Sequence, residues 1–137
     1  MKPLNFLILA TILTISCSSQ KVSDEIIITY NASTRGKTIQ VKISSKIIEK
    51  NENENKIRRE TPTTYWNEIK RLINKLNLED INSFKPSSDK RLYDGALHAT
   101  LNINLKSKVY ESQTFDHGNP PKELKEIVEK VLNLNIE

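Results

Sequence analysis

Apolar residues recur at strand-like spacing along the stretch that follows residue 24. Residues 25–30 form a short β-branched run, and apolar and polar residues then alternate through 39–47. Such alternation is typical of a strand with one buried face and one face in water. The polar run 50–56 is rich in turn formers, so we expect it to link two strands, with residues 56–60 returning as the second.

The spacing changes to a helical period in two places. Apolar side chains at positions 65, 66, 69, 72, 73 and 76 fall on one side of a helix of about four turns. Thr61 before it is a candidate N-cap, and Pro62 suits the first helical position. We expect Trp66 to be the centre of the packing of this helix. A second apolar stripe at helical spacing covers residues 124–132.

Between the two helices, residues 97–105 and 109–115 read as a hairpin, with a three-residue loop centred on Ser107. The order of elements is therefore β-β-(β)-α-β-β-α. Hairpins supply antiparallel pairs, and each amphipathic helix must bury its apolar stripe against something. The sequence predicts an α+β fold, with an antiparallel four- or five-stranded sheet and two helices on one face.

The first segment has the pattern of a bacterial export signal. A basic start precedes an apolar run over residues 4–15, which is shorter than the roughly 20 residues that a spanning helix needs. Residues 13–17 resemble a lipobox, in which the Cys becomes the lipidated first residue, although Thr14 stands where a typical box has Leu. A plain signal peptide with an incidental Cys is the alternative. We expect a signal peptide over 1–16 that is removed, a lipidated Cys17 with a tether over 17–24, and a single α+β domain over 25–137.

Composition narrows the classes of function. Removal of residues 1–16 takes away one of the 21 basic residues and none of the 17 acidic ones, which leaves a net charge of +3. This charge is mild and aromatic residues are few, so the sequence does not suggest a nucleic-acid partner. Cys17 is the only Cys in the chain, so no disulfide framework is available and the fold must rest on a hydrophobic core.

Two interpretations remain open for a set of five basic residues. If they cluster on one sheet edge, they would attract phosphate-bearing lipid or an acidic partner. Solvated strand positions and edge protection by Lys explain them without such a partner, and this is the interpretation that the sequence favours. The five are Lys37, Lys42, Lys46, Arg58 and Arg59.

The densest group of chemically versatile side chains lies in residues 115–121, with the sequence FDHGNPP. In the expected hairpin His98 lies opposite Asp116, within reach of a hydrogen bond between imidazole and carboxylate. Together with His117 and Asp94, these residues could serve a small hydrolase or bind a metal. Zinc sites, however, use three or four ligands, and no catalytic motif accompanies the four residues.

The same residues also suit a corner between a strand and a helix. Asp116 can bond the backbone two residues on, Gly118 can take a positive φ, and Asn119 can cap the helix behind Pro120. This interpretation leaves His117 facing solvent without a structural task. It is the more economical one, and it implies neither a metal nor a cofactor.

Several short segments form a combined pattern along the chain. They are the lipobox-like start, residues 30–36 (YNASTRG), the helix with Trp66, residues 94–96 (DGA) and residues 115–121. Taken together they resemble a family of small lipoproteins of Bacteroidota. The similarity covers nearly the whole chain after Cys17, and it implies no activity to carry over.

These features predict a lipid-anchored module of the bacterial cell envelope, attached through Cys17 to a membrane, the outer membrane being the expected one, and facing the periplasm or the cell surface. Because no catalytic constellation is recognisable, we expect it to bind a protein or a surface polymer without catalysis. One alternative is the hydrolase or metal-binding protein that uses His98, Asp116, His117 and Asp94. Another is an envelope-associated inhibitor.

Overall fold

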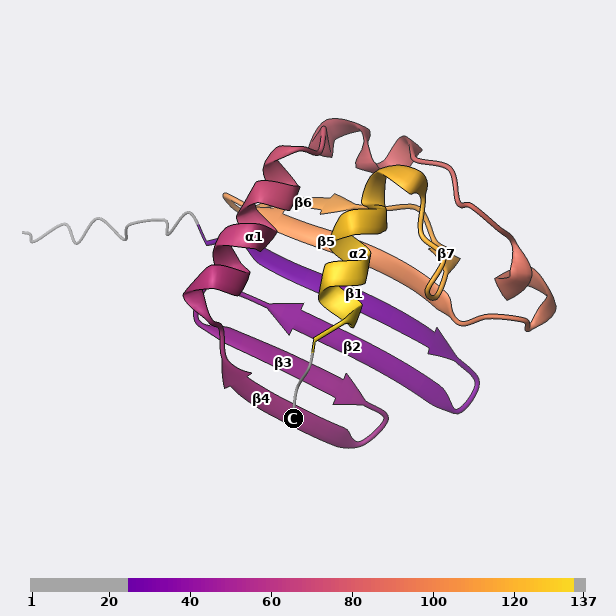
Figure 1. Ribbon diagram of the computed structural model, residues 1–137. Helices are drawn as coiled ribbons and strands as arrows, with labels where there is room; N and C mark the ends of the chain where they lie inside the picture. Colours follow the sequence, from indigo (N-terminus) through magenta and orange to yellow (C-terminus); the bar gives the residue numbers. More distant parts are fainter. Residues whose placement is uncertain (1–24, 135–137) are drawn as a thin grey trace, which may run out of the picture.

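The computed structural model describes residues 25–134, in which four strands, a helical segment, three more strands and a second helical segment follow one another (Figure 1). The predicted signal peptide, the lipidation at Cys17 and the tether lie outside the described residues. The strands are β1 (Ile27–Thr34), β2 (Lys37–Ile43), β3 (Ile47–Glu52), β4 (Asn55–Glu60), β5 (His98–Leu105), β6 (Lys108–Glu111) and β7 (Phe115–Asp116). The α-helices are α1 (Thr63–Asn74) and α2 (Lys125–Leu132), and the short 3-10 helices are η1 (Leu78–Ser83), η2 (Lys90–Tyr93) and η3 (Lys122–Leu124).

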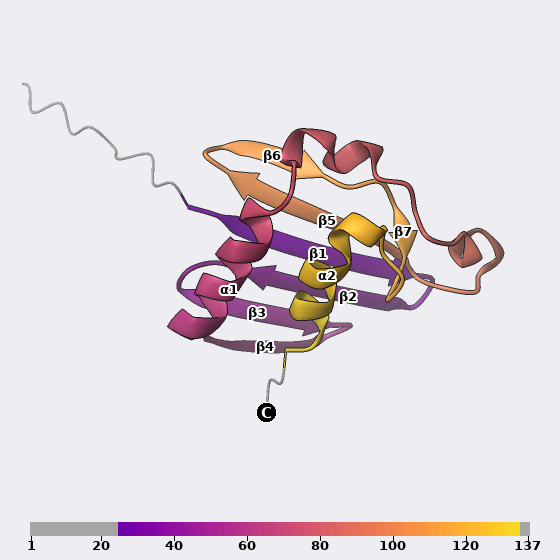
Figure 2. The same ribbon diagram turned by 45° about the horizontal axis from the view of Figure 1, so that its top comes forward.

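The strands form one antiparallel sheet in the order β4-β3-β2-β1-β5-β6, and β7 also pairs with β5. Both α-helices cover the same face of this sheet (Figures 1 and 2). The predicted α+β class and the antiparallel pairing are therefore confirmed. The sheet has seven strands rather than four or five, because the expected strand 39–47 is divided by a turn and the expected strand 109–115 by an irregularity at 112–114.

The hydrophobic core lies between this sheet face and the helices. The largest fully buried side chains are Tyr30 on β1 and Phe115 on β7, whose ring centroids lie 6.2 Å apart. The buried residues of α1 lie in its later turns. Trp66 is only partly buried against the cluster, so the expectation that it centres the packing is wrong. It stands in the first part of α1, which lies at the margin of the sheet (Figure 2).

A turn at Ser44 breaks the strand that was expected over residues 39–47. The Ser44 hydroxyl oxygen accepts hydrogen bonds from the backbone N–H groups of Lys46 (3.4 Å) and Ile47 (3.2 Å). Local bonds of this kind offer the backbone an alternative to a strand ladder. The chain therefore reverses from β2 into β3. The expected link 50–56 consists of the end of β3, a two-residue turn and the start of β4.

Thr61, the expected N-cap, has another role. No side chain caps α1, whose N-cap position is Pro62. The Thr61 hydroxyl instead donates to the backbone oxygen of Ser44 (2.9 Å), and its N–H donates to the oxygen of Lys46 (2.9 Å). Thr61 thus ties the end of β4 to the turn between β2 and β3.

The register of β5 against β6 and β7 changes along the hairpin. The turn has two residues, Lys106 and Ser107, both with positive φ (52° and 66°), which matches the twist of an antiparallel pair. Leu105 consequently pairs with Lys108 rather than with Val109. One extra residue between β6 and β7 then restores the expected pairs, among them His98 with Asp116. The Ser112 hydroxyl accepts the Leu101 N–H (3.0 Å) near this irregularity.

The two ends of the sheet carry different features. We call the end where the chain enters β1 the entry end. There Ile27 pairs with Asn104 and Ile43 pairs with Ile48, so the turns 44–46 and 106–107 flank the start of β1. The turns 35–36 and 53–54 lie at the opposite end, which we call the far end. The segment with η2 also lies there (Figures 1 and 2).

Candidate functional site

The predicted pair of His98 and Asp116 does not form. The two residues face each other across β5 and β7, as expected. The side chain of His98 is exposed, whereas Asp116 is 1% exposed and is covered by the segment 88–91. None of the hydrogen bonds of Asp116 in the described part of the chain goes to His98, because other donors occupy the carboxylate. The acid/base pair that the sequence left open as an alternative is therefore not formed among the described residues.

Asp116 is the centre of a hydrogen-bond network that fixes the start of η2. Its Oδ2 accepts from the Ser88 hydroxyl and from the Lys90 N–H (2.8 Å). Its Oδ1 accepts from the Arg91 N–H (3.0 Å) and from Arg91 Nη1 (3.1 Å). Burial alone would raise the pKa of Asp116. The hydrogen bonds from Ser88, Arg91 and Lys90 outweigh it and hold the pKa well below its usual range. Asp116 is therefore a carboxylate that binds backbone and guanidinium groups of its own chain.

Asn119 belongs to the same network and is not a helix cap. Its side-chain Nδ2 donates to the Ser88 hydroxyl oxygen (2.6 Å), and its N–H donates to the backbone oxygen of Asp116 (2.8 Å). The turn that leads into α2 starts behind Pro121, which makes no side-chain capping bond. The corner that we expected is present, but its side chains hold the segment of η2 rather than a helix terminus.

His117 has a structural task, contrary to expectation. It is partly buried, and its Nδ1 lies 2.7 Å from the hydroxyl oxygen of the buried Tyr30. Burial raises the pKa of Tyr30 well above its usual value, against the opposing effect of a hydrogen bond from the Gly118 backbone. The phenol thus stays protonated. Burial, and then the charge of Lys37, lower the pKa of His117, and Glu52 opposes them, so the environment favours the neutral ring. In the tautomer with its proton on Nε2, Nδ1 accepts the hydrogen bond from Tyr30.

Asp94 lies apart from the other three predicted site residues. It is exposed, with a positive φ of 57°, at the C-terminal end of η2. Among residues 25–134 no group of three or more His, Cys, Asp or Glu side chains is arranged to hold a metal ion. The structure places Asp116 and His117 in separate structural contacts and leaves His98 and Asp94 exposed. The four residues do not converge on one site.

The feature that sequence reasoning missed is the pair of apolar side chains on η2. Leu92 is 62% exposed and Tyr93 is 84% exposed. They follow directly on the two residues whose backbone N–H groups bind Asp116. The sequence carried one signal for them, a Leu-Tyr pair inside a Lys-, Asp- and Gly-rich stretch that belongs to neither apolar stripe. The network thus holds a turn that presents a leucine and a tyrosine to solvent.

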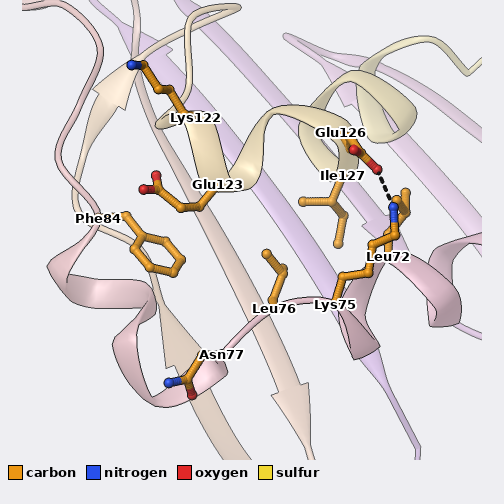
Figure 3. A pocket seen from close by; sticks show the side chains of 9 residues that line it. All are labelled: Leu72, Lys75, Leu76, Asn77, Phe84, Lys122, Glu123, Glu126 and Ile127. Atoms are coloured by element: carbon orange, nitrogen blue, oxygen red, sulfur yellow. Dashed lines mark hydrogen bonds and ion pairs between the residues drawn. The ribbon is translucent and has the colours of Figure 1, made fainter.

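A groove of about 450 Å³ lies on the helical side, where α1, η1 and the start of α2 meet (Figure 3). The ion pair between Lys75 Nζ and Glu126 Oε2 (3.0 Å) spans one side of it. None of the lining residues carries a hydroxyl, thiol or imidazole group, so the groove can receive an apolar group but offers no such nucleophile. Its lining consists of Leu72, Lys75, Leu76, Asn77, Phe84, Lys122, Glu123, Glu126 and Ile127.

Comparisons with models of protein families, with curated proteins and with solved structures found no match. The resemblance to Bacteroidota lipoproteins therefore stays a prediction from the sequence. No helix among the described residues is long and apolar enough to cross a membrane.

Proposed function

We propose that this protein is a lipid-anchored module of the bacterial cell envelope that binds a protein or a surface polymer without catalysis. The observation that carries the proposal is the exposed pair Leu92 and Tyr93, which a buried carboxylate network holds in place. Tyrosine is enriched among the residues that dominate binding energies, because it combines a large apolar face with a polar tip. A pre-ordered turn also lowers the entropy cost of association.

The position of the pair on the domain fits an anchored binding module. Leu92 and Tyr93 belong to η2 at the far end of the sheet, whereas the chain enters β1 at the entry end (Figure 1). The proposed anchor, Cys17, precedes Glu25 by eight positions. With the entry end near the bilayer, the far end would be turned toward a partner.

The two alternative functions fare differently. The hydrolase or metal protein required His98, Asp116, His117 and Asp94 to converge, and the separate environments of these residues remove the basis for that site. The inhibitor differs from the favoured function only in the identity of the partner. The same experiment therefore bears on both binding functions.

The test is cross-linking in intact cells with a photoreactive amino acid in place of Tyr93. We expect a discrete adduct with one protein, or a ladder if the partner is a polymer. Val109 is the matched control position, since it is also apolar and exposed but lies on β6. Equal yields from positions 93 and 109 would refute the role of η2.

The anchor is tested separately by the substitution Cys17→Ala. We expect the variant to be soluble or to remain unprocessed, because it lacks the thiol that would carry the lipid. A processed variant that still fractionates fully with membranes would contradict the anchor. Mass spectrometry of the wild-type chain measures the acyl groups directly.

A further inference from the structure

We propose that the entry end of the sheet is a membrane-facing surface that binds the phosphates of anionic lipid headgroups. The proposal rests on the lipid anchor of the proposed function and deepens it, since it assigns an orientation on the membrane. The proposed membrane-facing surface consists of the two turns that flank the start of β1, 44–46 and 106–107, together with the adjoining part of β4. Three exposed basic residues define it, namely Lys46, Lys106 and Arg58.

Lys46 and Lys106 stand at the tips of the two turns. Both are exposed, and neither forms an ion pair with another described residue. The turns lie on opposite sides of β1, about three strand spacings apart, which is roughly 14 Å. Two unpaired cations at this separation, at the outermost points of one end, can reach different headgroups at the same time.

Arg58 joins the same end through β4. Glu25, Ile27, Lys42 and Arg58 line one shallow depression, so the residue where the described chain begins lies next to these two bases. Arg58 is exposed, and its Nε is 3.5 Å from Oε1 of the partly buried Glu49, which leaves other guanidinium nitrogens for an anion. Exposed acidic residues also lie at this end, namely Glu25, Glu60 and Glu79, the last of which pairs with Lys108 next to the turn 106–107. The attraction therefore comes from the turn tips rather than from a large net charge.

The length of chain before Glu25 limits the distance between the domain and the bilayer. The eight peptide units from Cys17 to Glu25 span at most about 28 Å. The strand β1 has 8 residues, so the far end lies roughly 26 Å beyond the entry end. The tether is thus about as long as the domain and by itself permits either end to face the bilayer, so it is the cations at the turn tips that would hold the entry end against the headgroups. Electrostatic attraction is screened over about 8 Å in physiological salt, so only charges at the nearest end can act on the headgroups.

The structure also decides between the two interpretations that the sequence left open for the five basic residues. Four of the five lie toward the entry end, namely Lys42, Lys46, Arg58 and Arg59. Lys37, in contrast, starts β2 beside the far-end turn and forms an ion pair with Glu52 (3.4 Å). The basic residues are therefore not one edge cluster. The basic residues that could bind headgroups are those at the entry end of the sheet. They include Lys106, which the sequence pattern did not single out.

The experiment uses the lipidated chain reconstituted into vesicles that carry a nitroxide quencher on the lipid headgroup. A fluorophore is attached to an introduced Cys at an exposed position of the entry end (Ser45→Cys) or of the far end (Thr34→Cys). Vesicles are either neutral phosphatidylcholine or phosphatidylcholine with phosphatidylglycerol. We expect stronger quenching at 45 than at 34, and a difference that grows by at least about twofold with the anionic lipid and shrinks in high salt.

Two matched triple variants locate the effect. The entry-end variant is Lys46→Gln, Arg58→Gln and Lys106→Asn, where Asn suits the positive φ at position 106. The far-end variant, Arg35→Gln, Lys56→Gln and Lys90→Gln, removes the same charge. We expect the first to abolish the dependence on anionic lipid and the second to retain it. Equal dependence in both variants, or no dependence in the wild type, would overturn the proposal. Loss of acyl mass in the purified chain would instead refute the anchor.

Discussion

The carboxylate of Asp116 and the guanidinium of Arg91 form a buried ion pair, with 3.1 Å between Oδ1 and Nη1 and side chains that are 2% and 11% exposed. The pair is supported by two backbone N–H groups and a serine hydroxyl on the same carboxylate. A charge buried to this extent is tolerated only when it is fully hydrogen-bonded. The segment with Leu92 and Tyr93 is therefore positioned by a contact to a residue more than twenty positions later in the chain.

Removal of the Asp116 carboxylate should destabilise the protein and release η2. Asp116→Ala leaves the two N–H groups without their acceptor and leaves the guanidinium of Arg91 with only the Asp89 carboxylate and the Ser88 backbone oxygen, and we expect a loss of about 3 to 5 kcal/mol in the free energy of unfolding. Urea denaturation measures it. Asp94→Asn is the control, since Asp94 is exposed and Asn accepts its positive φ, and we expect a change below about 0.5 kcal/mol. Similar values for both variants would contradict the network.

The contact between His117 and Tyr30 should also be measurable. His117→Ala takes the acceptor away from a hydroxyl in the core, which costs about 1 to 3 kcal/mol for an unsatisfied buried group. His98→Ala removes an exposed imidazole and should cost less than about 0.5 kcal/mol. Thermal or urea unfolding of the two variants compares them directly. A silent His117→Ala would mean that water replaces the imidazole at the phenol.

The pH dependence of stability should report on His117. Its pKa is lowered in the folded protein, by burial first and then by Lys37, so the folded state disfavours the protonated ring. The stabilisation from this group is therefore fully present above the unfolded pKa of about 6.5 and is lost as the pH falls below it. Urea unfolding at about pH 7.5 and about pH 5.5 measures the decrease.

His117→Gln serves as the control for this titration, because its amide can still accept the Tyr30 hydrogen bond but does not ionise. The decrease in stability between the two pH values should be smaller in this variant than in the wild type. Equal decreases in both proteins would show that other groups cause the pH dependence.

Phe115 and Trp66 should contribute differently to the stability of the fold. Phe115 is fully buried and contacts Tyr30, so Phe115→Ala should cost about 3 to 5 kcal/mol. Trp66 is partly buried at the margin of the sheet, so Trp66→Ala should cost clearly less. Chemical denaturation ranks the two variants. The reverse order would mean that α1 docks more deeply than its burial indicates.

The local sequence determined which segments become strands and which become helices. Alternating apolar residues marked β2 and β5, and two helical stripes marked α1 and α2, because each period turns apolar side chains to one side. Breaks inside the predicted strands were harder to see. The Ser44 turn and the irregularity between β6 and β7 lie where polar strand residues and turn residues look alike. The local pattern therefore predicts too few strands, although it predicts the right class of fold.

The pairing of His98 with Asp116 shows where sequence reasoning ends. The prediction reached the right partners with a three-residue loop, whereas the chain uses a two-residue turn and one extra residue further on. The register depends on every turn and every extra residue along the hairpin. Here the turn is one residue shorter than predicted and one extra residue follows later, so the two errors cancel. Even the correct register did not create the acid/base pair that stood as an alternative, since the segment 88–91 occupies the carboxylate of Asp116.

Tertiary structure alone decided what the side chains of the corner do. Asp116 contacts residues 25 to 28 positions earlier in the chain, and His117 contacts Tyr30 at a separation of 87 positions. The segment with η2 has no apolar period that would place it against β7, so no pattern along the chain announces these contacts. The period of apolar residues along a segment indicates only which side of that segment is buried. Which distant donor fills a given carboxylate or imidazole depends on how the whole chain closes around its core.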